Sequence, residues 1–543
     1  MTPSYDYVII GAGSAGCVLA NRLSAEPSTN VLLIEAGGAD SRLLMKMPIG
    51  FYRLFNNKSV TWAYRSQPEP HANNRVMPLW RGKVLGGTSS INGMTYTRGH
   101  PSGYDDWDTL GAHGWRYSDV LPYFRRAENS WRREDAFHGR GGPLTVSPMP
   151  DSPFVDLIFE TARNADLPIT DDINGLQNEG FCRIELTVHR GRRGSTSHRY
   201  LRPVRGRSNL TIATNSHVRR ITIADGRAVG VEFGRMGRSE RAHASREVIL
   251  CAGAYNSPQL LMLSGIGPAA ELLEHGITPI VDLPGVGRNL MDHVTVPSQY
   301  RVIEPITLHR DLRLDRVFLA GARWAIRGTG LAARPPFGCW QFLRTQPELE
   351  RPDIQSMLNP VSSSSHIWIP WLNPGVGELF SASSTLLYPK SRGHVRLRSS
   401  DPFDPPRILN NFCSEPEDVT TLIAALRARR DFSAHEPLAS IIAAELLPGL
   451  DRRSNAELDA YVRLYCSSGF HPCGTCAMGE GAHAVVDDKL KVRGVEGLRI
   501  ADASIMPSIV GGNINAAVIM IAERAADLLR EHRFPFAQDG HAN

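Results

Sequence analysis

Three glycines near the start of the chain, Gly11, Gly13 and Gly16, have the spacing of a turn that binds a dinucleotide. The first permits a sharp bend, the second lets the backbone approach a pyrophosphate, and the third allows a helix to pack closely on a strand. Unpaired N–H groups at the start of that helix stabilise the phosphates. Glu35 follows Gly16 by 19 residues, where a carboxylate binds ribose hydroxyls and repels a 2′-phosphate. The pattern predicts FAD or NAD and disfavours NADP.

The residues around this turn predict the elements that it needs. An apolar, β-rich run precedes it at 5–10, apolar residues at helical spacing follow it at 17–24, and a second apolar run lies at 31–34. A strand, a helix and a second strand within about 30 residues form the setting in which the glycine pattern indicates a dinucleotide site. We expect further strands at 210–223, 229–233, 248–250, 485–486 and 498–500, with helices at 257–264 and 514–530.

The middle of the chain has a different character. From 296 to 465 the predicted strands are longer, rich in aromatic residues and separated by prolines, for example at 384–388 and 394–397. We interpret this part as a second domain. The predicted division gives 1–150, 201–295 and 466–543 to the nucleotide-binding domain, and 151–200 and 296–465 to the second domain.

Two longer segments carry a family resemblance. Residues 82–94 read Gly-Lys-Val-Leu-Gly-Gly-Thr-Ser-Ser-Ile-Asn-Gly-Met, and residues 253–267 begin Gly-Ala-Tyr-Asn-Ser-Pro. Both closely resemble the signatures of the glucose-methanol-choline (GMC) oxidoreductase family. With the glycine turn, residues 284–293 and the C-terminal segments described below, the resemblance extends from 5 to about 530. It is strongest to the bacterial alcohol and choline dehydrogenase branch, with pyridoxine oxidase-like members also near.

The resemblance implies a mixed α/β (α+β) fold, in which a Rossmann-like FAD-binding domain is joined to a substrate-binding domain built on an antiparallel sheet. The cofactor is then FAD. Gly86 and Gly87 are expected to let the backbone pass close to the flavin or its phosphates. The residues expected to bind FAD are Gly11, Gly13, Ser14, Ala15, Gly16, Glu35, Ala36, Val84, Gly86, Gly87, Thr88, Asn92, Gly93, Met94, Val218, Cys251, Ala252, Gly253, Asp502, Ala503, Asn515 and Ala516.

One departure from the family bears on how FAD is held. Some members attach it covalently through a histidine directly after the Ser-Ser pair, and this chain has Ile91 there. Because an isoleucine cannot form that bond, we expect non-covalent FAD.

The segment 471–479, which begins His-Pro-Cys-Gly-Thr, resembles the part of the family that contains the catalytic histidine. Alcohol oxidation requires removal of the hydroxyl proton as hydride leaves the carbon, and a histidine can accept that proton near neutrality. His471 is therefore the predicted base. Asn515 is its predicted partner, because family members carry His or Asn there and an amide cannot act as a base. Asn513 is a further candidate neighbour.

Cys473 and Cys476 form a C-x-x-C pair beside this histidine. A zinc site needs about four ligands, and no second pair lies at suitable spacing. A dithiol relay would need a disulfide partner for which nothing else argues. We therefore predict packed thiols and no metal site.

The choice of alcohol is less constrained. Choline enzymes of the family hold the trimethylammonium group with a carboxylate and aromatic rings, and the approximately corresponding stretch 335–342 contains no acid. We expect a neutral primary alcohol, aromatic alcohols included. Phe337, Trp340, Phe342 and Phe470 are the candidate pocket residues, with Trp368 and Trp371 as further aromatic candidates.

Several alternatives stay open. The same site would serve a choline dehydrogenase, or a hydroxynitrile lyase that keeps FAD without net redox change. The electron acceptor is oxygen or a quinone-like compound, and the sequence does not fix the oligomeric state.

Composition excludes other classes. The 543 residues carry 60 basic and 55 acidic side chains without a basic run, so nucleic acid binding is not expected. Eight irregularly spaced cysteines and the lack of an export signal favour the cytoplasm. No apolar stretch approaches the roughly 18 residues of a membrane span.

Overall fold

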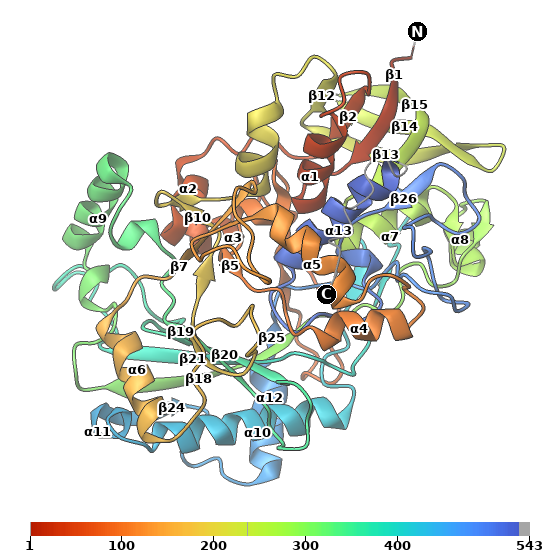
Figure 1. Cartoon of the computed structure of the whole chain (residues 1–543). Coiled ribbons are helices and arrows are strands. Elements are labelled where there is room, and N and C mark those ends of the chain that lie inside the picture. Colours follow the sequence, from red (N-terminus) through yellow and green to blue (C-terminus); the bar gives the residue numbers. More distant parts are fainter. Residues whose placement is uncertain (1, 236, 531–543) are drawn as a thin grey trace, which may run out of the picture.

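The computed structural model describes residues 2–235 and 237–530 (Figure 1). Two large sheets organise this part of the chain, one in the upper half of Figure 1 and one in the lower half. The mixed α/β character predicted from the sequence is confirmed. The last 13 residues of the predicted segment 466–543 lie outside the described residues.

The first sheet contains the predicted nucleotide-binding strands. Its order is β12-β2-β1-β15-β14-β13, with β26 paired to β15. The contacts among β12, β2, β1, β15 and β26 are parallel, whereas β13, β14 and β15 form an antiparallel meander. Their bounds are β1 Ser4–Ile10, β2 Val31–Ile34, β12 Leu210–Ala213, β13 Ser216–Ala224, β14 Arg227–Arg235, β15 Arg238–Leu250 and β26 Leu498–Ile500.

Two helices lie between this sheet and the rest of the molecule. Helix α1 (Ser14–Leu23) packs against α13 (Asn515–Leu529), so helices about 500 residues apart in sequence lie side by side (Figure 1). The fully buried Glu523 of α13 accepts hydrogen bonds from Arg22 at 2.7 and 2.9 Å, and from Tyr200 at 2.9 Å. Because a buried carboxylate is tolerated only when paired, these bonds fix the position of α13 against α1.

The second sheet is antiparallel throughout, in the order β24-β18-β21-β20-β19-β8, with β25 paired to β18. Helices α6 (Pro153–Asn164), α10 (Pro416–Ser433), α11 (Leu438–Ile441) and α12 (Asn455–Tyr465) lie below it in Figure 1. The strand bounds are β8 Gly180–Arg183, β18 Val294–Val302, β19 Cys339–Leu343, β20 Ile354–Asn359, β21 Leu379–Leu386, β24 Ile442–Leu447 and β25 Ser467–Ser468.

Some predicted elements differ from those observed. The run 210–223 is two strands, since the chain turns at Asn215, which has a φ of 51°. Strand β15 is 13 residues long, whereas the prediction covered only 248–250. Its first part is polar and largely exposed, so a search for apolar runs does not find it. Helix α7 begins at Gly253, four residues before the predicted start. The segment 485–486 forms no strand, and Val486 takes part only in isolated bridges with Met478 and Val492.

None of the helices in the described ranges combines the length and apolar character needed to cross a membrane. Helices α4 (Ser102–Thr109) and α5 (Tyr117–Ala127) lie within the loop-rich region before residue 150. Helix α5 packs on α13 and so helps to hold that helix in place.

Candidate active site

A cavity of about 460 Å³ is lined by residues from both large sheets. It extends from the glycine turn at Gly11 to His471, and its volume is in the range of small-molecule sites. The expected FAD residues that line it are Gly11, Gly13, Ser14, Ala15, Glu35, Ala36, Gly87, Thr88, Asn92, Gly93, Met94, Val218, Cys251, Ala252, Gly253, Asp502, Ala503 and Asn515. Gly16, Val84, Gly86 and Ala516 do not line it.

The glycine turn is built as its spacing requires. A Cβ on Gly16 would lie 1.9 Å from the carbonyl oxygen of Gly11, so Gly16 is needed for helix packing. A Cβ on Gly13 would meet no protein atom closer than 3.9 Å and would project toward the cavity. Gly13 therefore keeps space open for a ligand, which fits a dinucleotide pyrophosphate at the start of α1.

Glu35 lies at the end of β2 with its carboxylate held by the protein backbone. It accepts hydrogen bonds from the amides of Ala12 at 3.0 Å and Gly37 at 2.8 Å. Burial raises the pKa of Glu35 to about 7, while these two bonds oppose the rise. Hydroxyl donors from a ribose would further favour the ionised carboxylate.

Asp502 fixes two segments on the opposite wall of the cavity. It accepts hydrogen bonds from the amide of Gly253 at 2.8 Å and the hydroxyl of Ser257 at 2.6 Å, and also from the amide of Ser504 at 2.8 Å. The carboxylate therefore ties the start of α7 to the chain that follows β26.

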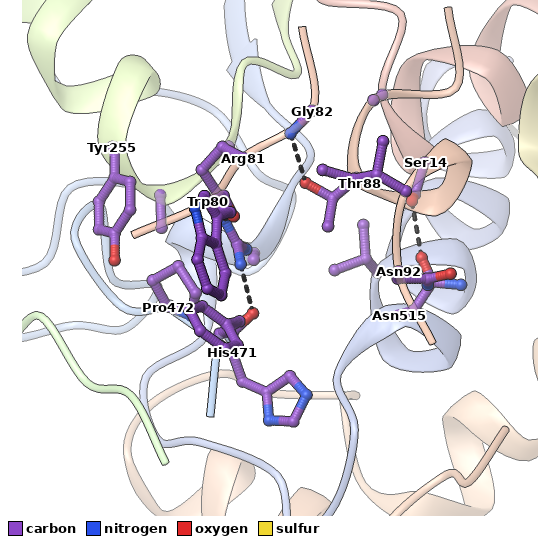
Figure 2. A pocket seen from close by; sticks show the side chains of 18 of the residues that line it. Ser14, Trp80, Arg81, Gly82, Thr88, Asn92, Tyr255, His471, Pro472 and Asn515 are labelled. Carbon is purple, nitrogen blue, oxygen red and sulfur yellow. Dashed lines mark hydrogen bonds between the residues drawn. The ribbon is translucent and has the colours of Figure 1, made fainter. Parts of the chain in front are cut away.

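Gly86 and Gly87 lie at points of close packing within the protein, and Gly87 also lines the cavity. A Cβ on Gly87 would lie 2.7 Å from the Cα of Gly13, and one on Gly86 would lie 2.2 Å from the hydroxyl of Ser90. Both glycines also have positive φ values, 85° and 52°. Gly87 is therefore required by its close packing on the backbone of Gly13, and Gly86 by its positive φ and by the nearby Ser90 side chain. Thr88, the next residue, lies beside Ser14 (Figure 2).

The catalytic end of the cavity contains two histidines in contact. The Nδ1 atoms of His293 and His471 lie 2.9 Å apart, and Nε2 of His293 lies 3.0 Å from the carbonyl oxygen of Leu387. Because a carbonyl only accepts, Nε2 of His293 carries the hydrogen and its Nδ1 is an acceptor. His471 must then donate from Nδ1, which leaves its Nε2 unprotonated.

Asn513, and not Asn515, contacts that unprotonated nitrogen. The Nδ2 of Asn513 lies 3.0 Å from Nε2 of His471, and Gln355 donates to the Oδ1 of Asn513 at 3.4 Å. The Oδ1 of Asn515 instead accepts a hydrogen bond from Ser14 at 2.7 Å (Figure 2). The predicted pairing of Asn515 with His471 therefore does not match the geometry, and Asn515 belongs to the nucleotide end.

The backbone of His471 is held by Asp292, next to His293. Asp292 accepts hydrogen bonds from the amide of His471 at 2.7 Å and from the hydroxyl of Ser468 at 2.5 Å. Ser468 in turn accepts from the amide of Phe470 at 2.8 Å. Burial raises the pKa of Asp292 to about 6, and these donors limit the rise. The segment 291–293 was part of the family resemblance, but its partners could not be read from the sequence.

Both histidines are neutral at neutral pH. Burial lowers the pKa of His293 to about 4. Burial also lowers the pKa of His471 well below its usual value, with smaller contributions from His293 and Arg81. Nε2 of His471 would gain a proton only at a pH well below the usual histidine pKa, so this nitrogen is available as a proton acceptor at neutral pH.

Aromatic rings lie beside His471. Trp80 stacks on Phe55 with ring centroids 4.6 Å apart and lies 4.8 Å from Phe470. Phe337 also lines the cavity, 5.5 Å from Phe51. Trp80 and Phe55 were missed in the sequence, although Trp80 lies only two residues before the first family signature.

Four aromatic predictions are wrong, because Trp340, Phe342, Trp368 and Trp371 do not line the cavity. Trp368 stacks on His309 instead. Trp340 and Phe342 lie in a hydrophobic core on β19 and do not line the cavity. They alternate with Gln341 along the strand and share one face, which is turned into the core. Trp371 is fully exposed. Cys473 and Cys476 are both buried in the core of the first sheet's domain.

Among residues 2–235 and 237–530, no carboxylate lines the catalytic end. The two acidic residues that line the cavity, Glu35 and Asp502, lie at the nucleotide end. Arg81 lies near His471, donating hydrogen bonds to the backbone carbonyls of Phe470 at 2.6 Å and Trp80 at 2.5 Å. Among the described residues it takes part in no ion pair.

Comparison with known proteins agrees with this architecture. Residues 5–295 match the N-terminal family model of GMC oxidoreductases, and residues 389–522 match the C-terminal one. The chain is a GMC oxidoreductase. Its predicted family, enzyme class and FAD cofactor are confirmed, and so is the FAD-binding fold.

Similar proteins of this family include bacterial and fungal enzymes. The chain is 42% identical to the oxygen-dependent choline dehydrogenase of Ectopseudomonas mendocina, covering 98% of this chain and 95% of the relative. It is 43% identical to the Klebsiella pneumoniae enzyme of the same name, covering 97% and 96%. Among solved structures, pyridoxine 4-oxidase from Mesorbium loti is 32% identical with a TM-score of 0.88, covering 98% of this chain and all of that chain.

We predict that valine at Gly13 and valine at Gly16 have different effects, the first on FAD binding and the second on folding. Gly13→Val should fold but fail to retain FAD, because its side chain occupies the pyrophosphate position. Its melting temperature should equal that of FAD-stripped wild type. Gly16→Val should fail to fold, since its Cβ overlaps the backbone. FAD absorbance and thermal melting measure both. A fully flavinylated Gly13→Val protein would contradict the nucleotide assignment.

Alanine substitutions of the two asparagines should affect different properties of the enzyme. Asn513→Ala should keep FAD and slow flavin reduction by roughly tenfold or more, through lost alignment at His471. Asn515→Ala should weaken FAD retention by roughly fivefold, the scale of one hydrogen bond. Anaerobic flavin reduction and FAD titration measure these effects. The assignment fails if Asn515→Ala alone slows reduction while Asn513→Ala reacts at the wild-type rate.

Proposed function

We propose that this GMC oxidoreductase oxidises a small primary alcohol to the aldehyde, with His471 as the base. The observation that carries the proposal is the unprotonated Nε2 of His471, which is fixed by His293 and faces the cavity. Bound FAD supplies the acceptor for the hydride. The substrate hydroxyl gives up its proton to Nε2 as the C–H bond breaks, so the products are the aldehyde, a reduced flavin and a protonated imidazole.

The substrate must take the place of an amide. Nε2 of His471 has one lone pair in the ring plane, and in this structure Asn513 donates to it. An alcohol hydroxyl that donates to Nε2 displaces this contact. The freed amide can then donate to the substrate oxygen, which orients the alcohol and stabilises negative charge that develops there. Gln355 keeps the amide in the orientation that this role requires.

Choline is the first candidate substrate. The relatives named above are choline dehydrogenases, which supports choline more than the neutral alcohol predicted from the sequence. The rings of Phe55, Trp80 and Phe470 all line the cavity, where an aromatic face can contact a quaternary ammonium. The word "oxygen-dependent" in the names of these relatives makes oxygen the first acceptor to test.

A neutral alcohol is the second candidate, and the charge of the pocket favours it. In the part of the chain that the structure describes, the catalytic end is lined by Arg81 and by no carboxylate. The second sheet presents small and polar side chains there, including Thr295, Ser383 and Thr385. A cation would therefore depend on ring faces alone. The lyase alternative has no support from the relatives, whose names are those of oxidoreductases.

FAD is proposed to be non-covalent. Ile91 lines the cavity, is buried and has no group that can bond to a flavin.

The test compares choline with its uncharged isostere 3,3-dimethylbutan-1-ol in anaerobic flavin reduction. If choline is the substrate, its kcat/KM should exceed that of the isostere by roughly tenfold, the scale of a cation–π contact. The opposite order would identify a neutral-alcohol enzyme. With the better alcohol, His471→Ala should keep FAD and react at least about 100-fold more slowly.

The pH profile adds a second criterion. Because the pKa of His471 is lowered, its Nε2 stays free as the pH falls to about 6.5, the usual histidine value. The wild-type rate should be constant above that value and fall only below it, as the base becomes protonated. The matched control His113→Ala changes an exposed histidine and should leave rate and profile unchanged. A His471→Ala protein that reduces its flavin at the wild-type rate would refute the proposal.

A further inference from the structure

Helix α9 (Leu314–Arg327) presents an apolar stripe to solvent. Phe318 is 71% exposed, Leu319 69% and Ile326 82%, whereas Trp324 on the opposite side is buried. The helix lies at the outer left edge of the molecule in Figure 1, and its main partners are the short helices that flank it, η5 (Arg310–Leu312) and η6 (Leu331–Ala333). An exposed stripe of this size indicates an interaction surface.

A second apolar element lies beside the start of α9. The tip 370–372 carries Trp371, which is fully exposed, and Leu372, which is 78% exposed. Backbone hydrogen bonds between Trp368 and residues 312 and 314 hold this loop against the helix start, at 3.1 and 3.0 Å. The bond from the amide of Ile369 to the carbonyl of Asn373, at 2.9 Å, closes the tip. The helix stripe and the tip therefore form one surface.

Arginines border this surface. Arg316, Arg323 and Arg327 are spaced by seven and four residues, so they share one side of α9, next to the apolar stripe. Arg316 lies 3.8 Å from Asp311, but none of the ion pairs among the described residues involves Arg323 or Arg327. Residues 310–327 contain five arginines and two aspartates. The surface is apolar with a basic border.

We propose that α9 and the tip 370–372 bind the surface of an anionic lipid bilayer. The exposed apolar side chains would enter the headgroup region, and the arginines would pair with lipid phosphates. A tryptophan at the tip suits the membrane interface, where an indole has both apolar and polar surroundings. A helix with this distribution lies in the plane of the membrane.

The charge distribution argues against a second copy as the occupant. A twofold dimer would place α9 against α9, since such an interface uses the same patch on both subunits. The unpaired Arg323 and Arg327 would then approach their own equivalents, and the patch itself offers only Asp311 and Asp315 to balance them. An anionic bilayer provides both the apolar phase and the compensating charge.

The proposed surface lies near the aromatic end of the cavity. Helix η6, directly after α9, contacts η1 (Pro48–Gly50), which leads into α3 (Phe51–Phe55). Phe51, Tyr52 and Phe55 of α3 line the cavity, and Tyr52 is itself half-exposed. A bilayer bound at α9 would therefore lie beside the segment that borders the active site.

Co-sedimentation of the FAD-loaded protein with lipid vesicles tests the proposal. Wild type should bind vesicles of phosphatidylcholine and phosphatidylglycerol, mixed at about three to one, at least roughly tenfold more tightly than phosphatidylcholine alone. The double variant Phe318→Ser/Trp371→Ser should bind the mixed vesicles at least roughly tenfold more weakly than wild type. Arg323→Glu/Arg327→Glu should lose affinity by roughly fivefold or more per residue. All should reduce their flavin with alcohol in solution as wild type does.

The matched control is Leu176→Ser/Leu273→Ser, which removes two exposed leucines outside the proposed surface and should bind vesicles as wild type does. The proposal is overturned if wild type stays unbound with both vesicle types, or if the Phe318→Ser/Trp371→Ser variant binds as tightly as wild type. Equal wild-type binding to both vesicle types would overturn the role of the arginines. A dimer in sedimentation equilibrium that Phe318→Ser/Trp371→Ser dissociates, without vesicle binding, would assign the surface to a second copy.

Discussion

The carbonyl oxygen of Leu387 is the acceptor on which the chemistry of this site depends. It requires a hydrogen on Nε2 of His293, so Nδ1 of that ring accepts from His471, and Nε2 of His471 is left free. Two neutral imidazoles in a buried environment keep this arrangement because burial lowers the pKa of both. The base is thus prepared by a backbone group and a second histidine, without a carboxylate contact to the ring.

The two sheets contribute different parts of this arrangement. Leu387 follows β21 and His293 directly precedes β18, and these strands are neighbours in the second sheet. Strand β25, which pairs with β18, leads directly to His471, so the histidine is placed by the same sheet. The first sheet and its glycine turn supply the nucleotide end. The segment that leads into α13 joins the two ends, because Asn513, just before the helix, contacts His471, and Asn515, its first residue, contacts Ser14.

The sequence was sufficient wherever local pattern decides the structure. The glycine turn, the strands at 5–10, 31–34 and 498–500, and the start of the last helix follow from spacing and apolar runs. The partner of His471 did not follow. Asn515 is the first residue of α13 and Asn513 precedes the helix, so the direction of the Asn513 side chain is set by tertiary packing and not by helical spacing. The prediction that Trp340 and Trp371 line the pocket failed for a similar reason, because an aromatic residue type does not specify whether the side chain faces a core, a cavity or solvent.

The most direct test of the central claim is the ¹⁵N NMR spectrum of the His471 ring in FAD-loaded protein at neutral pH. The signals can be identified by their loss in His471→Ala. The account predicts a protonated Nδ1 and an unprotonated Nε2, with His293 in the opposite tautomer. A hydrogen on Nε2 of His471 under these conditions would contradict it, since that nitrogen could not then accept the substrate's proton.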